Sequence, residues 1–117
     1  MTDQSAELSA EDQKLVTLAR TTWGRTGGPE GAAVRDSDGR TYAAATVALP
    51  SLRVSALGVC VAMAVSSGSR GLEAALLLTD RGELSPFDLE VLRDFGGPGV
   101  PVHIGDPRGT IVASTTT

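Results

Sequence analysis

Cysteine, histidine and lysine are nearly missing from this chain, which has one of each: Cys60, His103 and Lys14. A single cysteine excludes a disulfide within the chain and a Cys-x-x-Cys zinc knuckle. A single histidine leaves no second imidazole for a metal site, and a Ser-His-Asp triad would need its other two members placed independently. We therefore expect His103 to point to solvent or to pack at a sheet edge.

Aromatic residues make up only 3% of the 117 residues, so a core must be built from Ala, Val and Leu. The hydrophobic fraction of 41% is ordinary for a globular protein, and the length indicates one domain over residues 1–117. We expect residues 1–8 and 114–117 to be flexible. The predominance of Arg over Lys, with abundant Ala and Gly, suggests a GC-rich bacterial genome.

The chain also has no excess of positive charge. Its net charge is -4, and no cluster of basic residues offsets this. Nucleic-acid binding begins with phosphate neutralisation, so we expect no nucleic-acid partner. The longest apolar stretch, Val54 to Val65, is far shorter than the roughly 20 residues that span a bilayer, so we expect no membrane partner. Residues 1–7 are polar and lack the features of a signal peptide, which favours a cytoplasmic location.

Capping residues and apolar spacing predict three helices. Ser9 with Asp12 resembles a capping box, in which Asp12 reaches back to the helix start, and predicts a helix over 10–23. The span 52–66 is apolar on nearly every side, which indicates a helix buried in a core or an interface. Ser85 as N-cap and Pro86 at the first helical position predict a third helix that ends near residue 95.

Turn residues and short apolar runs predict five strands. Asp38-Gly39 indicates a hairpin between runs 31–35 and 40–45. A buried strand is expected over 73–79, followed by strands at 100–104 and 110–113, with residues 115–117 frayed at the end. The order α-β-β-α-β-α-β-β gives a five-stranded sheet with three helices.

Four segments carry a resemblance to a known family: Gly31-Ala32-Ala33-Val34, Asp38-Gly39-Arg40-Thr41-Tyr42, Val59-Cys60-Val61-Ala62 and Val91-Leu92-Arg93-Asp94-Phe95. Together with the order of elements they resemble the cytidine deaminase family over roughly residues 10–113. The resemblance implies an α/β protein with a three-layer α/β/α fold, a five-stranded mixed sheet and about three helices. Family members begin the second helix with Cys-Ala-Glu and the third with Pro-Cys-x-x-Cys. Their three thiolates bind zinc, and the Glu moves the proton.

The chain departs from that pattern at most of the chemically important positions. The resemblance places Cys60 at the first zinc-ligand position, Ser85 and Asp88 at the two cysteine positions, and Ala62 at the catalytic Glu. Leu89 and Glu90 replace an Arg-Gln pair, and Thr46 and Ala48 stand where Asn and Glu bind substrate. The resemblance thus implies a degenerate zinc site with no catalytic residue, no metal and no cofactor.

Simple structural roles also explain these residues. Cys60 has only apolar neighbours in the sequence and suits a small core position. Ser85 and Asp88 suit a helix N-terminus, since Ser accepts backbone N–H bonds and Asp complements the helix dipole.

We interpret the chain as a non-catalytic cytidine-deaminase-like pseudoenzyme that acts as a structural, interaction or ligand-binding module. It would work through a homo-oligomer, a dimer or tetramer, or through a protein partner. One alternative is a hydrolytic cytidine or nucleoside deaminase with an altered site and bound zinc. Another is a metal-free nucleoside or nucleotide sensor that keeps the pocket.

Overall fold

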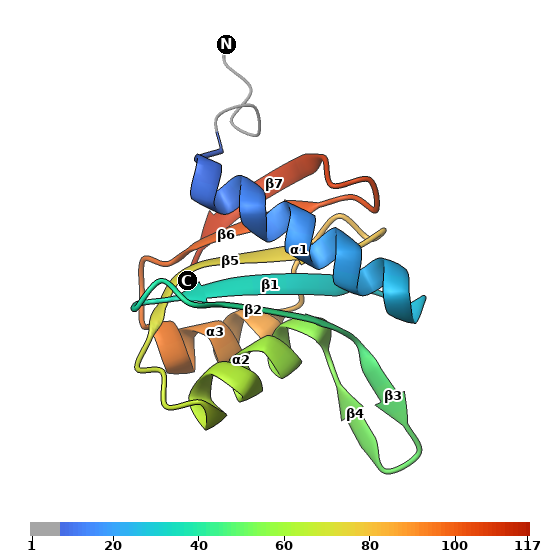
Figure 1. The fold of residues 1–117 in the computed structure, drawn as a ribbon, viewed down its shortest axis with the longest axis horizontal. Coiled ribbons are helices and arrows are strands. Elements are labelled where there is room, and N and C mark those ends of the chain that lie inside the picture. Colours follow the sequence, from blue (N-terminus) through green and yellow to red (C-terminus); the bar gives the residue numbers. More distant parts are fainter. Residues whose placement is uncertain (1–7) are drawn as a thin grey trace.

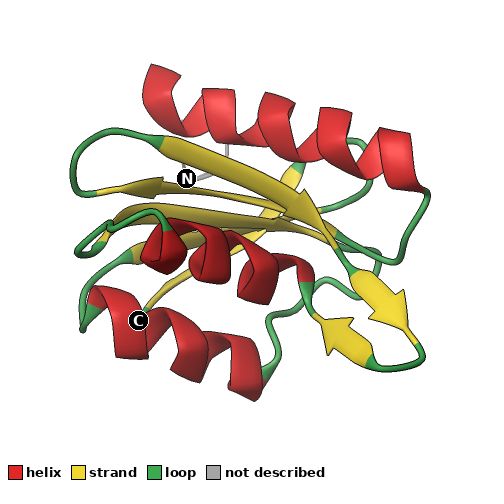
Figure 2. Ribbon diagram, turned by 60° about the horizontal axis from the view of Figure 1, so that its bottom comes forward, coloured by secondary structure: helices red, strands yellow, loops and turns green. Residues whose placement is uncertain are grey.

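A computed structural model describes residues 8–117 as three layers, with one helix above a mixed sheet and two helices below it (Figures 1 and 2). The helices are α1 (Ala10–Thr26), α2 (Ala56–Ser66) and α3 (Pro86–Gly96). The sheet has the order β2-β1-β5-β6-β7, with bounds Thr41–Ala45, Gly31–Asp36, Leu72–Leu78, Pro101–Gly105 and Ile111–Thr116. Only β5 and β6 pair in parallel. The predicted α/β/α fold and five-stranded mixed sheet are confirmed.

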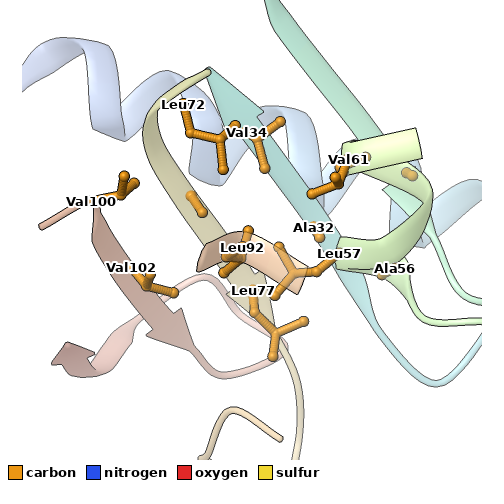
Figure 3. Packing of buried hydrophobic residues seen from close by; sticks show 13 residues of the cluster. Ala32, Val34, Ala56, Leu57, Val61, Leu72, Leu77, Leu92, Val100 and Val102 are labelled. Carbon is orange, nitrogen blue, oxygen red and sulfur yellow. The ribbon is translucent and has the colours of Figure 1, made fainter. Parts of the chain in front are cut away.

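Two hydrophobic clusters, one on each face of the sheet, hold the layers together. Successive side chains of a strand point to opposite faces, so Ala32 and Leu77 pack toward α2 and α3 while Ala33 and Leu76 pack toward α1. Figure 3 shows the first cluster, where Leu57 of α2 and Leu92 of α3 meet the sheet. The small residues of β1 allow these helices to approach the sheet closely.

The start of α1 follows the predicted cap, but Asp12 does not complete a capping box. The Ser9 hydroxyl oxygen accepts a hydrogen bond from the Asp12 backbone N–H at 3.0 Å. The Asp12 carboxylate instead binds Arg35 and His103 across the fold. The helix also continues past Gly24 to Thr26 and ends at Gly27, whose φ of 67° suits the left-handed region.

The predicted start of the second helix at residue 52 is wrong, because a short hairpin precedes it. Strand β3 (Val47–Leu49) pairs antiparallel with β4 (Leu52–Val54), and the hairpin projects from the body of the molecule (Figure 1). Helix α2 then begins after Ser55, whose hydroxyl oxygen accepts the Gly58 N–H at 3.0 Å. A run as short as Leu-Arg-Val fits a strand as well as a helix, and pairing across the hairpin decides between them.

The predicted fraying of residues 115–117 is also wrong. Strand β7 runs to Thr116, and Thr117 is buried. The Thr117 N–H donates to the Val100 carbonyl at 3.0 Å, and its hydroxyl oxygen accepts the Val100 N–H at 2.9 Å. Threonine is favoured in strands, so this end of the described chain is held against β6. Residues 1–7, which were also predicted to be flexible, lie outside the described residues.

Candidate functional site

The N-termini of α2 and α3 converge on one hydrogen-bonded cluster. Ser55 caps α2, and Ser85 caps α3 by accepting the Asp88 N–H at 3.1 Å. The Ser55 hydroxyl and the Asp88 Oδ1 atom are 2.7 Å apart, although the two residues are far apart in the sequence. Asp88 is buried, with 2% of its surface exposed. The carboxylate therefore lies where the positive ends of two helix dipoles meet.

The direction of the hydrogen bond between Ser55 and Asp88 follows from the cap. The Ser55 oxygen accepts the Gly58 N–H, so its single proton is free to be donated to the carboxylate. A hydrogen bond to a charged acceptor is stronger than a neutral one. Gly58 leaves the room for this arrangement, because a Cβ there would lie 3.0 Å from the Ser55 oxygen.

The positions that the resemblance assigns to the family's substrate-binding Asn and Glu lie beside this cluster. Thr46 and Ala48 line a cavity of about 510 Å³ together with Ser55 and Phe87. Thr46 and Ser55 also line a neighbouring cavity of about 270 Å³. The Thr46 Oγ1 atom is buried and has no hydrogen-bond partner. The structure thus brings Thr46, Ala48, Ser85 and Asp88 to the same region, where Ser55 joins them.

Cys60 does not join this region. It lies more than one helical turn beyond Ser55, is fully buried, and its thiol donates to the Tyr42 carbonyl of β2 at 3.6 Å. Burial raises the pKa of Cys60 to about 12. The side chain is therefore a neutral thiol in the core between α2 and the sheet.

Ala62, the predicted position of the family's Glu, is exposed on α2. It lines an apolar cavity of about 540 Å³ with Tyr42, Leu52 and Met63. Helix α2 carries no Asp or Glu anywhere along its length. The absence of a carboxylate from this helix therefore does not depend on how the chain is aligned with the family.

The donor set at the helix N-termini does not fit a zinc ion. Structural and catalytic zinc sites use thiolates, imidazoles and carboxylates, with at least three protein ligands. Here the Ser55 and Ser85 oxygens already accept backbone N–H bonds, and Asp88 supplies the one carboxylate. Within residues 8–117 no group of three or more His, Cys, Asp or Glu side chains is placed to hold a metal ion.

An ion pair between Glu30 and Arg81 lines the smaller cavity. The Arg81 guanidinium lies 2.7 Å from the carboxylate of Glu30, whose side chain is largely buried. The hydrogen bond that Arg81 donates to Glu30 raises the pKa of Arg81, and the Asp88 charge acts in the same direction. Sequence reasoning missed Glu30, Arg81 and Ser55. For Ser55 a signal was present, because a serine directly before an apolar, alanine-rich run is typical of an N-cap.

A second polar cluster lies on the α1 side of the sheet. His103 Nε2 is 3.0 Å from Asp12 Oδ2, and His103 Nδ1 is 3.0 Å from the Ser114 hydroxyl. The Nη2 atom of Arg35 donates to Asp12 Oδ1 at 2.8 Å, and its Nε–H donates to Glu73. His103 is thus largely buried in the interior strand β6, so the expectation that it faces solvent or an edge is wrong.

No helix among residues 8–117 has the length and apolar character needed to cross a bilayer.

Comparisons with known proteins agree with this architecture. A family model described as cytidine deaminase-like matches residues 8–109. A cytidine deaminase from Burkholderia pseudomallei has a similar structure, with a TM-score of 0.77 and 19% identity over 93% of each chain. A cytidine deaminase from Mycobacterium leprae has a TM-score of 0.73 and 19% identity, over 92% of this chain and 94% of that one. A comparison with curated protein sequences gave no match.

The α/β/α layers and five-stranded mixed sheet of this chain are the fold that these two structures share with it. The family match covers most of the chain, and the chain therefore belongs to the cytidine deaminase-like family.

Proposed function

We propose that this chain is a non-catalytic member of its family, which acts as a structural, interaction or ligand-binding module. The observation that carries this proposal is the bond between Ser55 and Asp88 at the helix N-termini. It engages the single carboxylate there with a protein hydroxyl. Hydrolytic deamination needs an activated water and a group that moves protons. Helix α2 supplies no carboxylate for proton transfer, and the donor set does not suit zinc.

Deaminase activity tests this proposal directly. Purified protein should release no ammonia from cytidine or deoxycytidine above background, and it should contain no stoichiometric zinc by elemental analysis. Ala62→Glu should not restore turnover, because a metal-bound water would still be missing. Turnover by the native chain that is abolished by Asp88→Ala would instead favour the alternative of a hydrolytic deaminase with an altered site.

A metal-free nucleoside or nucleotide sensor is the second candidate, and Thr46 supports it. Its buried Oγ1 atom lacks a partner and lies at two adjoining cavities beside Ser55. A polar group of a ligand would satisfy this hydroxyl. Nucleosides should then raise the melting temperature of the native chain, and the isosteric variant Thr46→Val should lose that shift. Absence of any shift with the native chain would remove this candidate.

A homo-oligomer, a dimer or tetramer, forms part of the same proposal. Leu49 and Leu52 of the projecting hairpin are 56% and 53% exposed, and Val65 of α2 is 52% exposed. Leu52 also lines the apolar cavity with Met63. Exposed apolar surface of this kind marks interaction sites, and an isolated two-stranded hairpin is only marginally stable. A second copy or another protein partner would cover it. A cytoplasmic location is also part of this proposal.

A further inference from the structure

The region where zinc does not fit is nevertheless built around one charged group. Asp88 is buried at the third position of α3 and bonds to Ser55 at the cap of α2. The cap of α3 is Ser85, which accepts the Asp88 N–H. Asp88 thus bonds to the cap of its own helix through its backbone N–H and to the cap of the neighbouring helix through its side chain.

The chemistry of this contact explains why a carboxylate stands there. Both helix starts present partial positive charge, which a buried anion neutralises. The Ser55 hydroxyl connects the start of α2 to Asp88, because it accepts a hydrogen bond from the α2 backbone and donates one to the carboxylate. Gly58 keeps the space beside the Ser55 oxygen clear.

We propose that Asp88 joins the starts of α2 and α3 in place of a metal ion, and that Ser55, not Cys60, is its partner on α2. This inference rests on the proposed function, and it revises the position assigned from the sequence. Cys60 lies deeper in the core with its thiol on the Tyr42 carbonyl, whereas Ser55 directly contacts Asp88. The three positions that correspond to the family's zinc-binding cysteines are then Ser55, Ser85 and Asp88.

Hydrogen exchange measures whether the two helices are joined. In Asp88→Ala, the Gly58 amide of α2 should exchange about tenfold faster than in the native chain, although it lies on another helix. The matched control is Asp94→Ala, an exposed carboxylate of the same helix α3, which should leave Gly58 unchanged. Asp88→Ala that speeds exchange only within α3 would overturn the proposal.

Cobalt(II) binding to cysteine variants identifies the partner on α2. A quadruple variant should bind one cobalt per chain with a tetrahedral thiolate spectrum. It combines Ser55→Cys, Ser85→Cys and Asp88→Cys with Cys60→Ala. Ser85→Cys with Asp88→Cys and native Cys60 should bind at least about a hundredfold more weakly. The opposite ranking would overturn the assignment of Ser55, as would a folded quadruple variant that binds no cobalt.

If the quadruple variant does not fold, urea unfolding of Ser55→Ala, Asp88→Ala and the double variant decides. If the two side chains share a bond, the urea midpoint of the double variant should fall by less than the sum of the falls in the two single variants. Falls that simply add would overturn the proposal. None of these measurements uses a substrate. Cytidine turnover by the native chain would therefore refute the proposed function without affecting these results.

Discussion

His103 Nε2 lies 3.0 Å from Asp12 Oδ2, so the only histidine of the chain connects β6 to the first turn of α1. Arg35 of β1 donates to the same carboxylate at 2.8 Å. One acidic side chain therefore joins α1 to two strands of the sheet. Asp12 and Arg35 are both largely buried, with side chains 14% and 10% exposed.

Loss of the Asp12 side chain should be costly for stability. Asp12→Ala removes the bonds to Arg35 and His103 and leaves a largely buried guanidinium with Glu73 as its remaining partner. We expect the free energy of unfolding, measured in urea, to fall by about 2 kcal/mol. The neighbouring Glu11 is exposed and lies 3.9 Å from Lys14, so Glu11→Ala should change stability by less than about 0.5 kcal/mol. Equal losses in the two variants would contradict this role of Asp12.

Two carboxylates predict how stability falls in acid. Burial alone would raise the pKa of Asp12, but hydrogen bonds from Arg35 and His103 outweigh it and hold the pKa below its ordinary 3.8. At Asp36 burial is likewise outweighed, mainly by the backbone N–H of Arg40, and the pKa is also lowered. Such groups contribute stability that is complete above the unfolded pKa and is lost as the pH falls through the folded one. The urea midpoint should therefore drop steeply below about pH 3.8.

Asp36 offers the sharper test of that acid dependence. It is fully buried, and its carboxylate accepts the backbone N–H groups of Asp38 and Arg40 at 2.9 Å each. Asp36→Asn should lower the midpoint at pH 7 and flatten the fall below about pH 3.8, because the amide does not titrate there. The exposed Asp94→Asn should keep the acid profile of the native chain. An unchanged profile in Asp36→Asn would show that another group sets the acid limit.

The turn at Asp38-Gly39 forms the predicted hairpin between β1 and β2, and it needs glycine for its backbone. Gly39 has a φ of 86°, its N–H donates to the Asp36 carbonyl at 3.0 Å, and no atom would obstruct a Cβ. Gly39→Val should therefore destabilise by roughly 1 kcal/mol or more through backbone strain alone. Gly24 also has open space around it, but it lies inside α1. Gly24→Ala should thus stabilise by about 0.5–1 kcal/mol, and a loss in both variants would point to a different cause.

Local signals predicted much of this fold, because caps and tight turns depend on neighbours in the sequence. Ser9, Ser85 and Asp38-Gly39 act in the structure as predicted. The β3–β4 hairpin was missed although its strands are adjacent in the sequence, because a run as short as Leu52–Val54 fits a strand as well as a helix. The pairing of Thr117 was missed because its partner Val100 is distant in the sequence, and no local pattern indicates such a partner.

The residues of the candidate site also differ in whether a local sequence signal identifies them. Ser85 and Asp88 were found because they surround a recognisable helix start, whereas Ser55 was hidden within a helix predicted to begin too early. The contact between Ser55 and Asp88 joins two elements separated by β5, and only the folded chain shows it. The Asp12–His103 contact was missed for the same reason.

The buried thiol of Cys60 should be chemically inert in the native protein. Its pKa is raised to about 12 by burial, and the side chain is fully inaccessible. Thiolate is the reactive form, so Ellman's reagent should label Cys60 only after denaturant unfolds the chain. Thr21→Cys in a Cys60→Ala background gives the control, because Thr21 is exposed on α1, on the face of the sheet away from the proposed interface. Rapid labelling of native Cys60 would contradict its place in the core.

Assembly gives the last prediction, and it concerns Met63. This half-buried residue lines the apolar cavity with Leu52 and Val59, next to the exposed part of the hairpin. A second copy that covers this surface would bury Met63, and a charge there would remain without a partner. Light scattering of the native chain should therefore give a mass above the 12.0 kDa of one chain, and Met63→Glu should shift it toward the monomer or unfold the protein. Thr21→Glu adds the same charge at an exposed position of α1, on the opposite face of the sheet, and should leave the mass unchanged. A well-folded native chain that stays near 12.0 kDa at micromolar concentration would refute the proposed homo-oligomer.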